Sequence, residues 1–464
     1  MRGFLRSLVL LLSVAAAGQS VAPTGTSTGV QSGSFFIAGG ASASPDVSVV
    51  SITLDEAIKR AQANEPSYAA AMAESRASAL ERSIARAALL PSVDFHNQAL
   101  YTQPSSLANQ AGQGTASQAA PRFIANNAIH EYASQAVVNE TIGLGQLAGV
   151  RHADAAAAFA AAELEIARRG LFGTVTGLYF GVIAANNKLA IADRAHSEAA
   201  SFTDLTGKRE RGREAAHADV VKAQLQEQQR QRELADAKLA ADKARLELGV
   251  LLFPDPRTPY SIAEPETPGA LASRGDVEQA AGKNNPELRS ALASLRQSNA
   301  DVLAARGAYL PALGLNYTYG IDAPQFAVNG PDNTHNLGYS AMVTLDIPVW
   351  DWLSTEHKVK QSQIRRDALK VALSATQRRL IARLDEAYAE AAAARDQLAS
   401  LDASVATAGE SLRLTKLRYT GGEATVLEVV DAQTAFLGAE NAREDGRVRY
   451  RAALADLQTL TGTM

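Results

Sequence analysis

The chain has 464 residues, with 45 Lys and Arg against 49 Asp and Glu, and a formal net charge of −4 at pH 7. This acidic balance argues against a nucleic-acid partner, because nucleic-acid binding needs a basic surface. There is no cysteine, which excludes disulfides, thiol chemistry and a lipid anchor on an N-terminal cysteine.

The N-terminus has the pattern of a secretory signal peptide. Arg2 and Arg6 precede an apolar run from Leu8 to Ala17, and small residues follow. The run is shorter than the roughly 20 residues that a membrane-spanning helix needs, so cleavage is favoured over an uncleaved anchor. We expect a signal peptide at 1–22 and a flexible leader, rich in Gly, Ser, Thr and Ala, at 23–50.

Two long stretches of the chain are copies of one another. Pro66 and Pro91 return as Pro286 and Pro311, each 220 residues later. A second set of residues returns after 209 positions: Tyr179, Leu189, Arg209, Gly212, Glu214 and Val220 become Tyr388, Leu398, Arg418, Gly421, Glu423 and Val429. The repeated unit is far longer than a solenoid repeat of about 20 to 50 residues, so the sequence predicts a tandem duplication of a large unit.

Each repeat is expected to run short helix, helix, two strands, long helix, turn, long helix. The first repeat is expected at 51–252 and the second at 273–464, with a linker at 253–272. Apolar and polar residues alternate in four segments, at about 91–103, 128–142, 311–322 and 336–348. Alternation predicts strands with one apolar face. Their length is close to the roughly 9 to 11 residues of tilted transmembrane strands, with a half-buried soluble hairpin as the alternative.

Two proline-free stretches predict long helical hairpins. No proline lies between Pro121 and Pro254, and none follows Pro348. Both stretches are rich in good helix formers, and each is interrupted by glycine, which favours a turn. We expect hairpins at 147–250 and 354–461, with turns at Gly212 and at Gly421 with Gly422.

The strand count constrains any membrane-bound assembly. Strands in lipid must close into a barrel, because unpaired backbone groups in hydrocarbon cost several kcal/mol each. Single-chain barrels begin at about eight strands, so four strands are too few. If the strands are transmembrane, several chains must share one barrel: two chains give eight strands, three give twelve and four give sixteen.

Several motifs have simpler interpretations than the chemistry they imitate. Gly143-Leu-Gly145-Gln-Leu-Ala148 imitates a dinucleotide fingerprint, but the chain continues as helix without the second parallel strand. The uncharged segment Leu171–Asn187, with glycines four residues apart, could dimerise in a membrane. Its counterpart at 380–397 is charged, which favours helix packing in water. The seven histidines match no metal-binding pattern, so we expect no enzyme, metal or cofactor.

The hairpin turns hold the strongest candidates for function. Glu428 and Asp431 are three residues apart and therefore share a helix face just after the second turn. If the helices line a tube, symmetry makes these carboxylates a ring that attracts cations and repels anions. The alternative is that acids near a helix N-terminus only suit its dipole.

The second turn reads Arg418-Tyr419-Thr-Gly421-Gly422 before Val-Leu-Glu428-Val-Val-Asp431-Ala. With this turn, the signal peptide, the duplication, the paired strands and the hairpins, the chain resembles the TolC-like outer membrane efflux proteins of Gram-negative bacteria. The resemblance covers nearly the whole chain, from about Ile52 to Gly462. It implies an α+β membrane protein. In such a protein long α-helical hairpins form a periplasmic α-barrel, and four strands per chain enter a shared trimeric 12-stranded β-barrel.

The same resemblance implies location and partners. It implies a homotrimer embedded in outer membrane lipid, with a periplasmic extension. This passive duct docks with a periplasmic adaptor (membrane fusion) protein and an inner-membrane transporter of RND or ABC type. It exports small molecules such as drugs or metals, or proteins through type I secretion. The rival interpretations are a soluble periplasmic coiled-coil scaffold or adaptor protein, and an exported enzyme.

The resemblance also implies roles for residues of the two turns, 209–219 and 418–431, which form the periplasmic tip of such proteins. The tip and constriction residues are Asp219, Tyr419, Gly421, Gly422, Glu428 and Asp431, with Arg209, Gly212 and Arg213 in the first turn. Asp219 and Tyr419 match positions that hold the tip closed, but Ala424 replaces an arginine expected near them. Gly212-Arg213 also departs from the usual Val-Gly.

Overall fold

The structure is a computed structural model that describes residues 50–101, 130–263, 269–330 and 335–463, all within one compact unit, Val49–Met464. The expected signal peptide at 1–22 and the leader up to residue 49 lie outside the described residues. Val50, which the sequence placed in the leader, instead begins the first strand.

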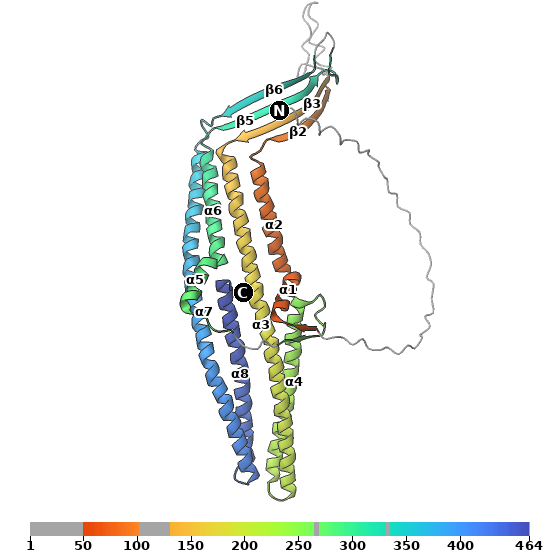
Figure 1. Cartoon of the computed structure of the whole chain (residues 1–464), viewed down its shortest axis with the longest axis vertical. Coiled ribbons are helices and arrows are strands. Elements are labelled where there is room, and N and C mark those ends of the chain that lie inside the picture. The colour runs from red at the N-terminus through yellow and green to blue at the C-terminus, as the bar shows by residue number, and fades with distance from the viewer. Residues whose placement is uncertain (1–49, 102–129, 264–268, 331–334, 464) are drawn as a thin grey trace, which may run out of the picture. The chain divides into compact units, whose positions relative to one another are not determined.

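The helices and strands follow the order that the duplication predicts (Figure 1). The first half contains β1 (Val50–Ile52), α1 (Leu54–Asn64), α2 (Pro66–Ala87), β2 (Ser92–Tyr101), β3 (His130–Ile142), α3 (Leu144–Arg211), α4 (His217–Leu252) and β4 (Tyr260–Ile262). The second contains α5 (Arg274–Asn284), α6 (Pro286–Gly307), β5 (Ala312–Ala323), β6 (Leu337–Asp346), α7 (Ser354–Thr420) and α8 (Val426–Thr461). Helices α4 and α8 begin and end 209 residues apart, so the interval found in the sequence is also structural.

The repeated prolines begin equivalent helices. Pro66 and Pro286 occupy the first positions of α2 and α6, where a missing N–H costs nothing. The preceding residues cap them, since Glu65 accepts a hydrogen bond from the Ser67 N–H and Asn285 one from the Leu288 N–H at 2.9 Å. Short sequence signals therefore fix where both helices begin.

Four strands form one antiparallel sheet in the order β2-β3-β5-β6, so the two repeats meet at β3 and β5. Phe95, Ala136, Tyr319 and Tyr339 lie side by side in one row across it. Since alternate residues point to opposite faces, the register places exposed hydrophobic side chains on one face. These are Val93, Phe95, Leu315, Tyr317, Tyr319, Tyr339, Val343 and Leu345. Within the described residues, the outer edges of β2 and β6 have no strand partner.

A second, two-stranded sheet was not predicted. Strands β1 and β4 pair in parallel, and β4 lies inside the segment expected to be a linker at 253–272. The hydroxyl of the buried Tyr179 lies 3.1 Å from the Ile52 carbonyl and 2.5 Å from the Ala263 carbonyl. Tyr260 donates to the Arg245 carbonyl at 2.6 Å, and burial raises its pKa to about 12. A tertiary hydrogen bond thus orders a segment whose composition indicates a loop.

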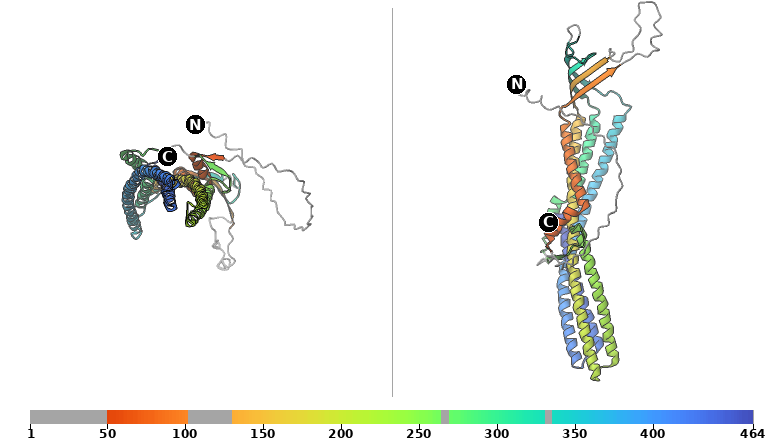
Figure 2. Two further views of the ribbon diagram at one scale, coloured as in Figure 1. Left: turned by 90° about the horizontal axis from the view of Figure 1, so that it is seen from below. Right: turned by 90° about the vertical axis from the view of Figure 1, so that its right-hand side faces the viewer.

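Helix α3 is the central element of the helical part. Its 68 residues span about 100 Å at 1.5 Å per residue, and it packs against α2, α4, α6 and α8. Figures 1 and 2 show α7, α8, α3 and α4 running side by side away from the sheet. In the uncharged segment, Leu171, Val175 and Val182 are buried in the main hydrophobic core. None of the described helices carries an apolar stretch of the length needed to cross a bilayer.

Arg169 on α3 joins the two repeats. Its side chain is buried, and its Nε lies 2.7 Å from a carboxylate oxygen of Glu165. Its Nη1 donates to the Thr459 carbonyl near the end of α8, and its Nη2 to the Asn284 carbonyl that ends α5, both at 2.9 Å. One side chain therefore links three helices.

The lowered pKa of Glu165 predicts that the stability of the fold depends on pH. Hydrogen bonds from Arg168, and then from Arg169, lower the pKa of Glu165 from 4.5 to about 2. Because the folded pKa lies below the unfolded one, the stabilisation is complete above about pH 4.5 and is lost as the pH falls toward 2. We expect Glu165→Gln to flatten this loss in urea unfolding followed by circular dichroism. Equal slopes against pH for both proteins would contradict the assignment.

Candidate functional site at the helical turns

The turns of the two hairpins share one backbone geometry. Figures 1 and 2 show both at the end of the helices farthest from the four-stranded sheet. In the first turn the Glu214 N–H donates to the Arg209 carbonyl at 2.8 Å, and in the second the Glu423 N–H donates to the Arg418 carbonyl at 2.8 Å. Each outer bond spans five residues and encloses a bond that spans three, from the Arg213 N–H to the Glu210 carbonyl and from the Gly422 N–H to the Tyr419 carbonyl. This is the Schellman pattern that ends many helices. The duplication extends to individual hydrogen bonds.

The two turns differ at the residue that must adopt a left-handed backbone. Gly422 has φ 80°, and Arg213, which lies 209 positions earlier, has φ 64°. Glycine adopts this conformation without a steric penalty, whereas a residue with a Cβ is strained by about 1–2 kcal/mol. The departure of Gly212-Arg213 from the usual Val-Gly therefore places a strained, exposed arginine at the end of the first hairpin.

This difference gives a matched pair of stability predictions. Arg213→Gly should raise the free energy of unfolding by about 0.5–1 kcal/mol, because the released strain exceeds the entropy gained by the unfolded chain. Gly422→Ala should lower it by about 1–2 kcal/mol. Gly421→Ala is the control, because Gly421 has φ −75° and an added Cβ would make only ordinary contacts at 3.5 Å. Urea unfolding measures all three, and equal effects at positions 421 and 422 would contradict the strain.

Tyr419 connects the two hairpins at the tip. It is 5% exposed, and its ring centroid lies 5.1 Å from that of Phe202 on α3. The guanidinium of Arg209 lies over the same ring, 4.9 Å from its centroid, and Nη1 of Arg209 donates to the Tyr419 carbonyl. The Tyr419 hydroxyl lies 3.3 Å from the hydroxyl of Thr206. A cation–π contact and hydrogen bonds thus hold the end of α7 on α3.

Asp219 and Tyr419, which the resemblance implies hold the tip closed, are not bonded to each other in the chain. Asp219 lies in the first turn of α4, and among the described residues it makes no hydrogen bond or ion pair with Tyr419. Ala424, at the position where an arginine was expected, packs against the cluster of Phe202, Tyr419 and neighbouring valines. Within one chain, Tyr419 contacts Arg209, Phe202 and Thr206 instead.

Glu428 and Asp431 have different surroundings. Glu428 forms a capping box with Thr425, in which its carboxylate accepts the Thr425 N–H at 3.1 Å, and Arg418 lies 3.3 Å from its other oxygen. The Thr425 N–H is the main cause that lowers the pKa of Glu428 below 4.5. Asp431 is exposed, and among the described residues its side chain makes no hydrogen bond or ion pair. Glu428 therefore caps α8 and pairs with Arg418, in addition to any functional role. The carboxylate of Asp431 has no such partner among the described residues.

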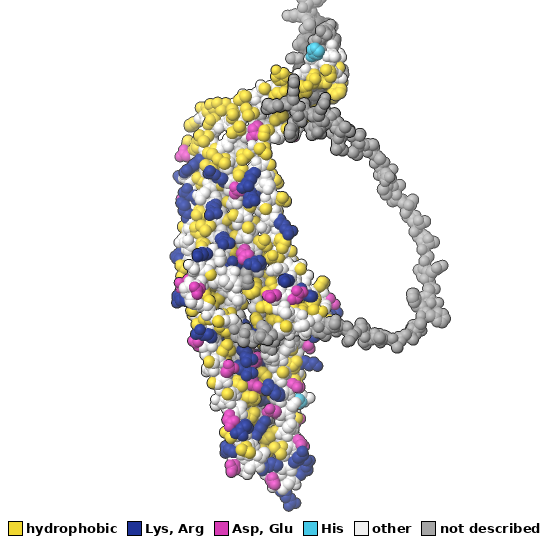
Figure 3. All heavy atoms as spheres, in the orientation of Figure 1, with side chains coloured by type: hydrophobic (Ala, Val, Ile, Leu, Met, Phe, Trp, Pro, Cys, Tyr) yellow, Lys and Arg dark blue, Asp and Glu magenta, His cyan; other side chains and the backbone are white. Residues whose placement is uncertain are grey.

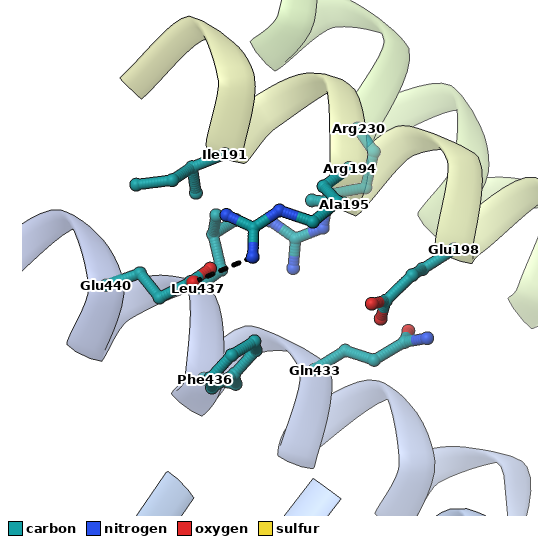
Figure 4. Close-up of a pocket in the computed structure, with 9 residues that line it drawn as sticks. All are labelled: Ile191, Arg194, Ala195, Glu198, Arg230, Gln433, Phe436, Leu437 and Glu440. Atoms are coloured by element: carbon teal, nitrogen blue, oxygen red, sulfur yellow. Dashed lines mark hydrogen bonds and ion pairs between the residues drawn. The ribbon is translucent and has the colours of Figure 1, made fainter. Parts of the chain in front are cut away.

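Farther from the tip, charged residues line the contact between the hairpins (Figure 4). Arg194 on α3 lies 3.2 Å from the buried carboxylate of Glu440 on α8. Arg230 on α4 is also buried, and it contacts Glu233 at 2.6 Å and the Thr434 hydroxyl at 2.9 Å. Both amide atoms of the buried Gln433 lack a hydrogen-bond partner beside a cavity of about 20 Å³. The two hairpins meet there through polar groups rather than a continuous apolar seam.

Sequence reasoning missed these buried charges and Arg169. The partners on the other hairpin are distant in the sequence: Arg194 and Glu440 are 246 positions apart, and Asn187 on α3 donates to the buried Glu444 on α8 at 3.0 Å across 257 positions. The only signal was an acid at positions 440 and 444, which share one helix face. Among the described residues, no group of three His, Asp or Glu side chains is placed to hold a metal ion.

Comparison with known proteins agrees with this architecture. Residues 277–463 match the family model described as "Outer membrane efflux protein". Outer membrane protein OprJ of Pseudomonas aeruginosa is 28% identical over 193 residues, which cover 42% of this chain and 38% of OprJ. Protein CyaE of Bordetella pertussis is 26% identical over 275 residues, which cover 57% of this chain and 56% of CyaE. The chain thus matches little more than half, or less, of the length of these relatives.

Solved structures share the fold. The CmeC outer membrane channel of Campylobacter jejuni superposes with a TM-score of 0.74 at 17% identity, covering 88% of this chain and 85% of CmeC. VceC of Vibrio cholerae gives a TM-score of 0.75 at 17% identity, covering 88% of this chain and 96% of VceC. The expected fold class of long helical hairpins with four strands per chain is therefore confirmed. Residues 277–463 therefore match the outer membrane efflux protein family, the TolC-like proteins, and the described chain has the fold of outer membrane channels.

Proposed function

We propose that three copies of this chain form a channel that exports small molecules such as drugs or metals, or proteins, across the outer membrane. The observation that carries the proposal is the four-stranded sheet, which has one apolar face and, in the described part of the chain, two outer edges without a partner, β2 and β6. An open sheet edge is unstable in lipid, so the edges need partners from other copies.

The strand directions support closure by a ring of copies. All neighbouring strands in the sheet are antiparallel, so β2 and β6 run in opposite directions. Strand β6 of one copy can therefore pair with β2 of the next and continue the antiparallel pattern. This contact joins two different surfaces, and such contacts close into rings when the rotation fits. Three copies give the twelve strands that the family resemblance implies.

The outer helices support the same assembly. Helix α4 packs on α3 and helix α7 on α8, which leaves a free side on each. Both helices carry exposed apolar residues: Val221, Leu225, Leu239, Leu246 and Val250 on α4, and Ile364, Val371, Ile381, Leu414 and Leu417 on α7. Contact between α4 of one copy and α7 of the next would cover them and continue the helices as a closed tube.

The proposed role is the exit duct of a tripartite efflux or type I secretion system, without a catalytic site. The names of the relatives support it, since one from Dickeya chrysanthemi is a proteases secretion protein and CmeC is an outer membrane channel. The proposed partners are a periplasmic adaptor and an inner-membrane transporter of RND or ABC type, and the docking surface proposed for them is the tip.

Cysteine cross-linking tests the assembly directly, because the chain has no native cysteine. Phe95→Cys on β2 is combined in turn with Tyr339→Cys, Ala341→Cys and Val343→Cys on β6, all on the apolar face. At least one pair should give covalent trimers in isolated membranes, whereas each single variant should not. Monomers throughout, or recovery of the chain in the soluble fraction as the scaffold interpretation requires, would contradict the channel.

The tip carboxylates give the conductance prediction. Replacing Glu428 and Asp431 together with alanine should raise single-channel conductance or weaken block by multivalent cations in planar bilayers, because a ring of like charges is removed. Glu428→Gln is the matched control for the cap, since its amide oxygen can still accept the Thr425 N–H. Unchanged conductance and unchanged cation block would remove both residues from the constriction.

A further inference from the structure

Both tryptophans of the chain lie in one short segment between β6 and α7. Trp350 is 67% exposed and Trp352 is 84% exposed, and Val349 beside them is 89% exposed. The two indole rings contact each other edge to face, with centroids 5.8 Å apart. Large aromatic side chains this exposed indicate a surface that another component covers.

The backbone of this segment is strained. Trp352 has φ 57° and Leu353 has φ 62°, the left-handed region that side chains with a Cβ rarely adopt. The start of α7 fixes this conformation, because the Thr355 N–H donates to the Asp351 carboxylate at 2.7 Å and the His357 N–H to the Leu353 carbonyl at 3.0 Å. Backbone strain that the surrounding hydrogen bonds maintain is typical of functional positions.

The other junctions between helix and sheet also expose apolar side chains. Leu89 and Leu90 lie between α2 and β2, and Tyr309 and Leu310 lie between α6 and β5. Figure 3 shows hydrophobic side chains gathered over the sheet and its junction with the helices, and Lys and Arg side chains spread over the helices. The change from apolar to charged surface therefore falls at these junctions.

We propose that Trp350 and Trp352 bind the headgroup layer of the phospholipid leaflet on the helix side of the sheet, and so fix how deeply the chain sits. The inference rests on the proposed membrane channel. Tryptophan prefers this layer, because its ring is apolar and its N–H seeks a polar partner. Continuity supports lipid as the occupant, since the apolar face of β6 ends beside the tryptophans. Exposed Lys358 and Lys360 follow on α7 and match lipid phosphates in charge.

Intrinsic fluorescence tests this, because every tryptophan of the chain is in the segment. The full chain is reconstituted into phospholipid bilayers that carry bromine either near the glycerol end or near the methyl end of the acyl chains. We expect the largest loss of emission with bromine near the glycerol end, and little quenching by acrylamide in the water. Trp350→Phe and Trp352→Phe, each leaving one fluorophore, show whether both rings lie at this depth.

Three results would overturn the anchor. Strong quenching by acrylamide without an effect of bromine would place the rings in water. Stronger quenching by bromine at the methyl end would place them in the bilayer core. Quenching by neither would place them against protein, such as a neighbouring copy. Each leaves the channel standing if the sample conducts, whereas failure of the chain to enter bilayers would refute the proposed channel instead.

Discussion

Replacing Arg169 with alanine is expected to lower the free energy of unfolding by about 3–5 kcal/mol, the range found when one partner of a buried ion pair is removed. The guanidinium binds the Glu165 carboxylate and the carbonyls of Thr459 and Asn284, near the ends of α8 and α5. These helix ends carry partial negative charge, which a buried cation stabilises. The alanine variant leaves the Thr459 and Asn284 carbonyls without this donor, while Glu165 keeps only its hydrogen bonds from Arg168.

The duplication supplies the control for Arg169. Arg378 lies 209 positions later on α7, is exposed, and its Nε contacts only the Ser374 carbonyl of its own helix, at 3.4 Å. Arg378→Ala should change stability by no more than about 0.5 kcal/mol. Arg169→Lys should fall near the alanine value, because an ammonium cannot form the planar fork of bonds. Urea unfolding in detergent measures each variant, and equal losses at positions 169 and 378 would refute the linking role.

Replacing Tyr419 with alanine is expected to loosen the tip. The substitution empties the site between Phe202 and Arg209 and removes the bond to the Thr206 hydroxyl. Loss of a buried aromatic ring costs about 3–5 kcal/mol, and here the cost falls on the contact between the hairpins. Faster amide exchange in both turns, and a higher single-channel conductance, are the expected results.

Two control variants distinguish loosening of the tip from a general loss of stability. Tyr419→Phe keeps the ring and its contact with Arg209 and loses only the hydroxyl, which is worth about 1 kcal/mol. Glu210→Ala changes the equivalent position of the first turn, where the side chain is partly exposed and pairs with His217 at 2.7 Å. Both should leave exchange in the second turn close to the unmodified protein. If Tyr419→Ala changes neither exchange nor conductance, the tip is held by other contacts.

Much of the fold was predictable because its signals are local. Proline-free stretches interrupted by glycine marked the two helical hairpins, and period-two alternation marked the four strands. The small sheet of β1 and β4 was missed because each strand has three residues, too few for a pattern, and depends on Tyr179 for its place. A short strand stabilised by a distant side chain has no signature in its own residues.

The candidate site was predictable in its location only. The glycine turns showed where the hairpins reverse, and the duplication showed that the turns are equivalent. The sequence did not show that Arg213 would adopt the backbone of Gly422, or that Tyr419 would contact Arg209 and Thr206. Side-chain partners depend on how two separately formed hairpins dock, and a linear pattern does not contain that geometry.

By itself the sequence determined the duplication, the order of helices and strands and the positions of the turns, because hydrophobic period, proline and glycine act within a few residues. Only the tertiary structure decided that β3 pairs with β5, that Arg169 reaches α8 across 290 positions, and that the outer edges of β2 and β6 have no partner among the described strands. These contacts bring together residues far apart in the chain, so they follow from packing rather than from local propensity.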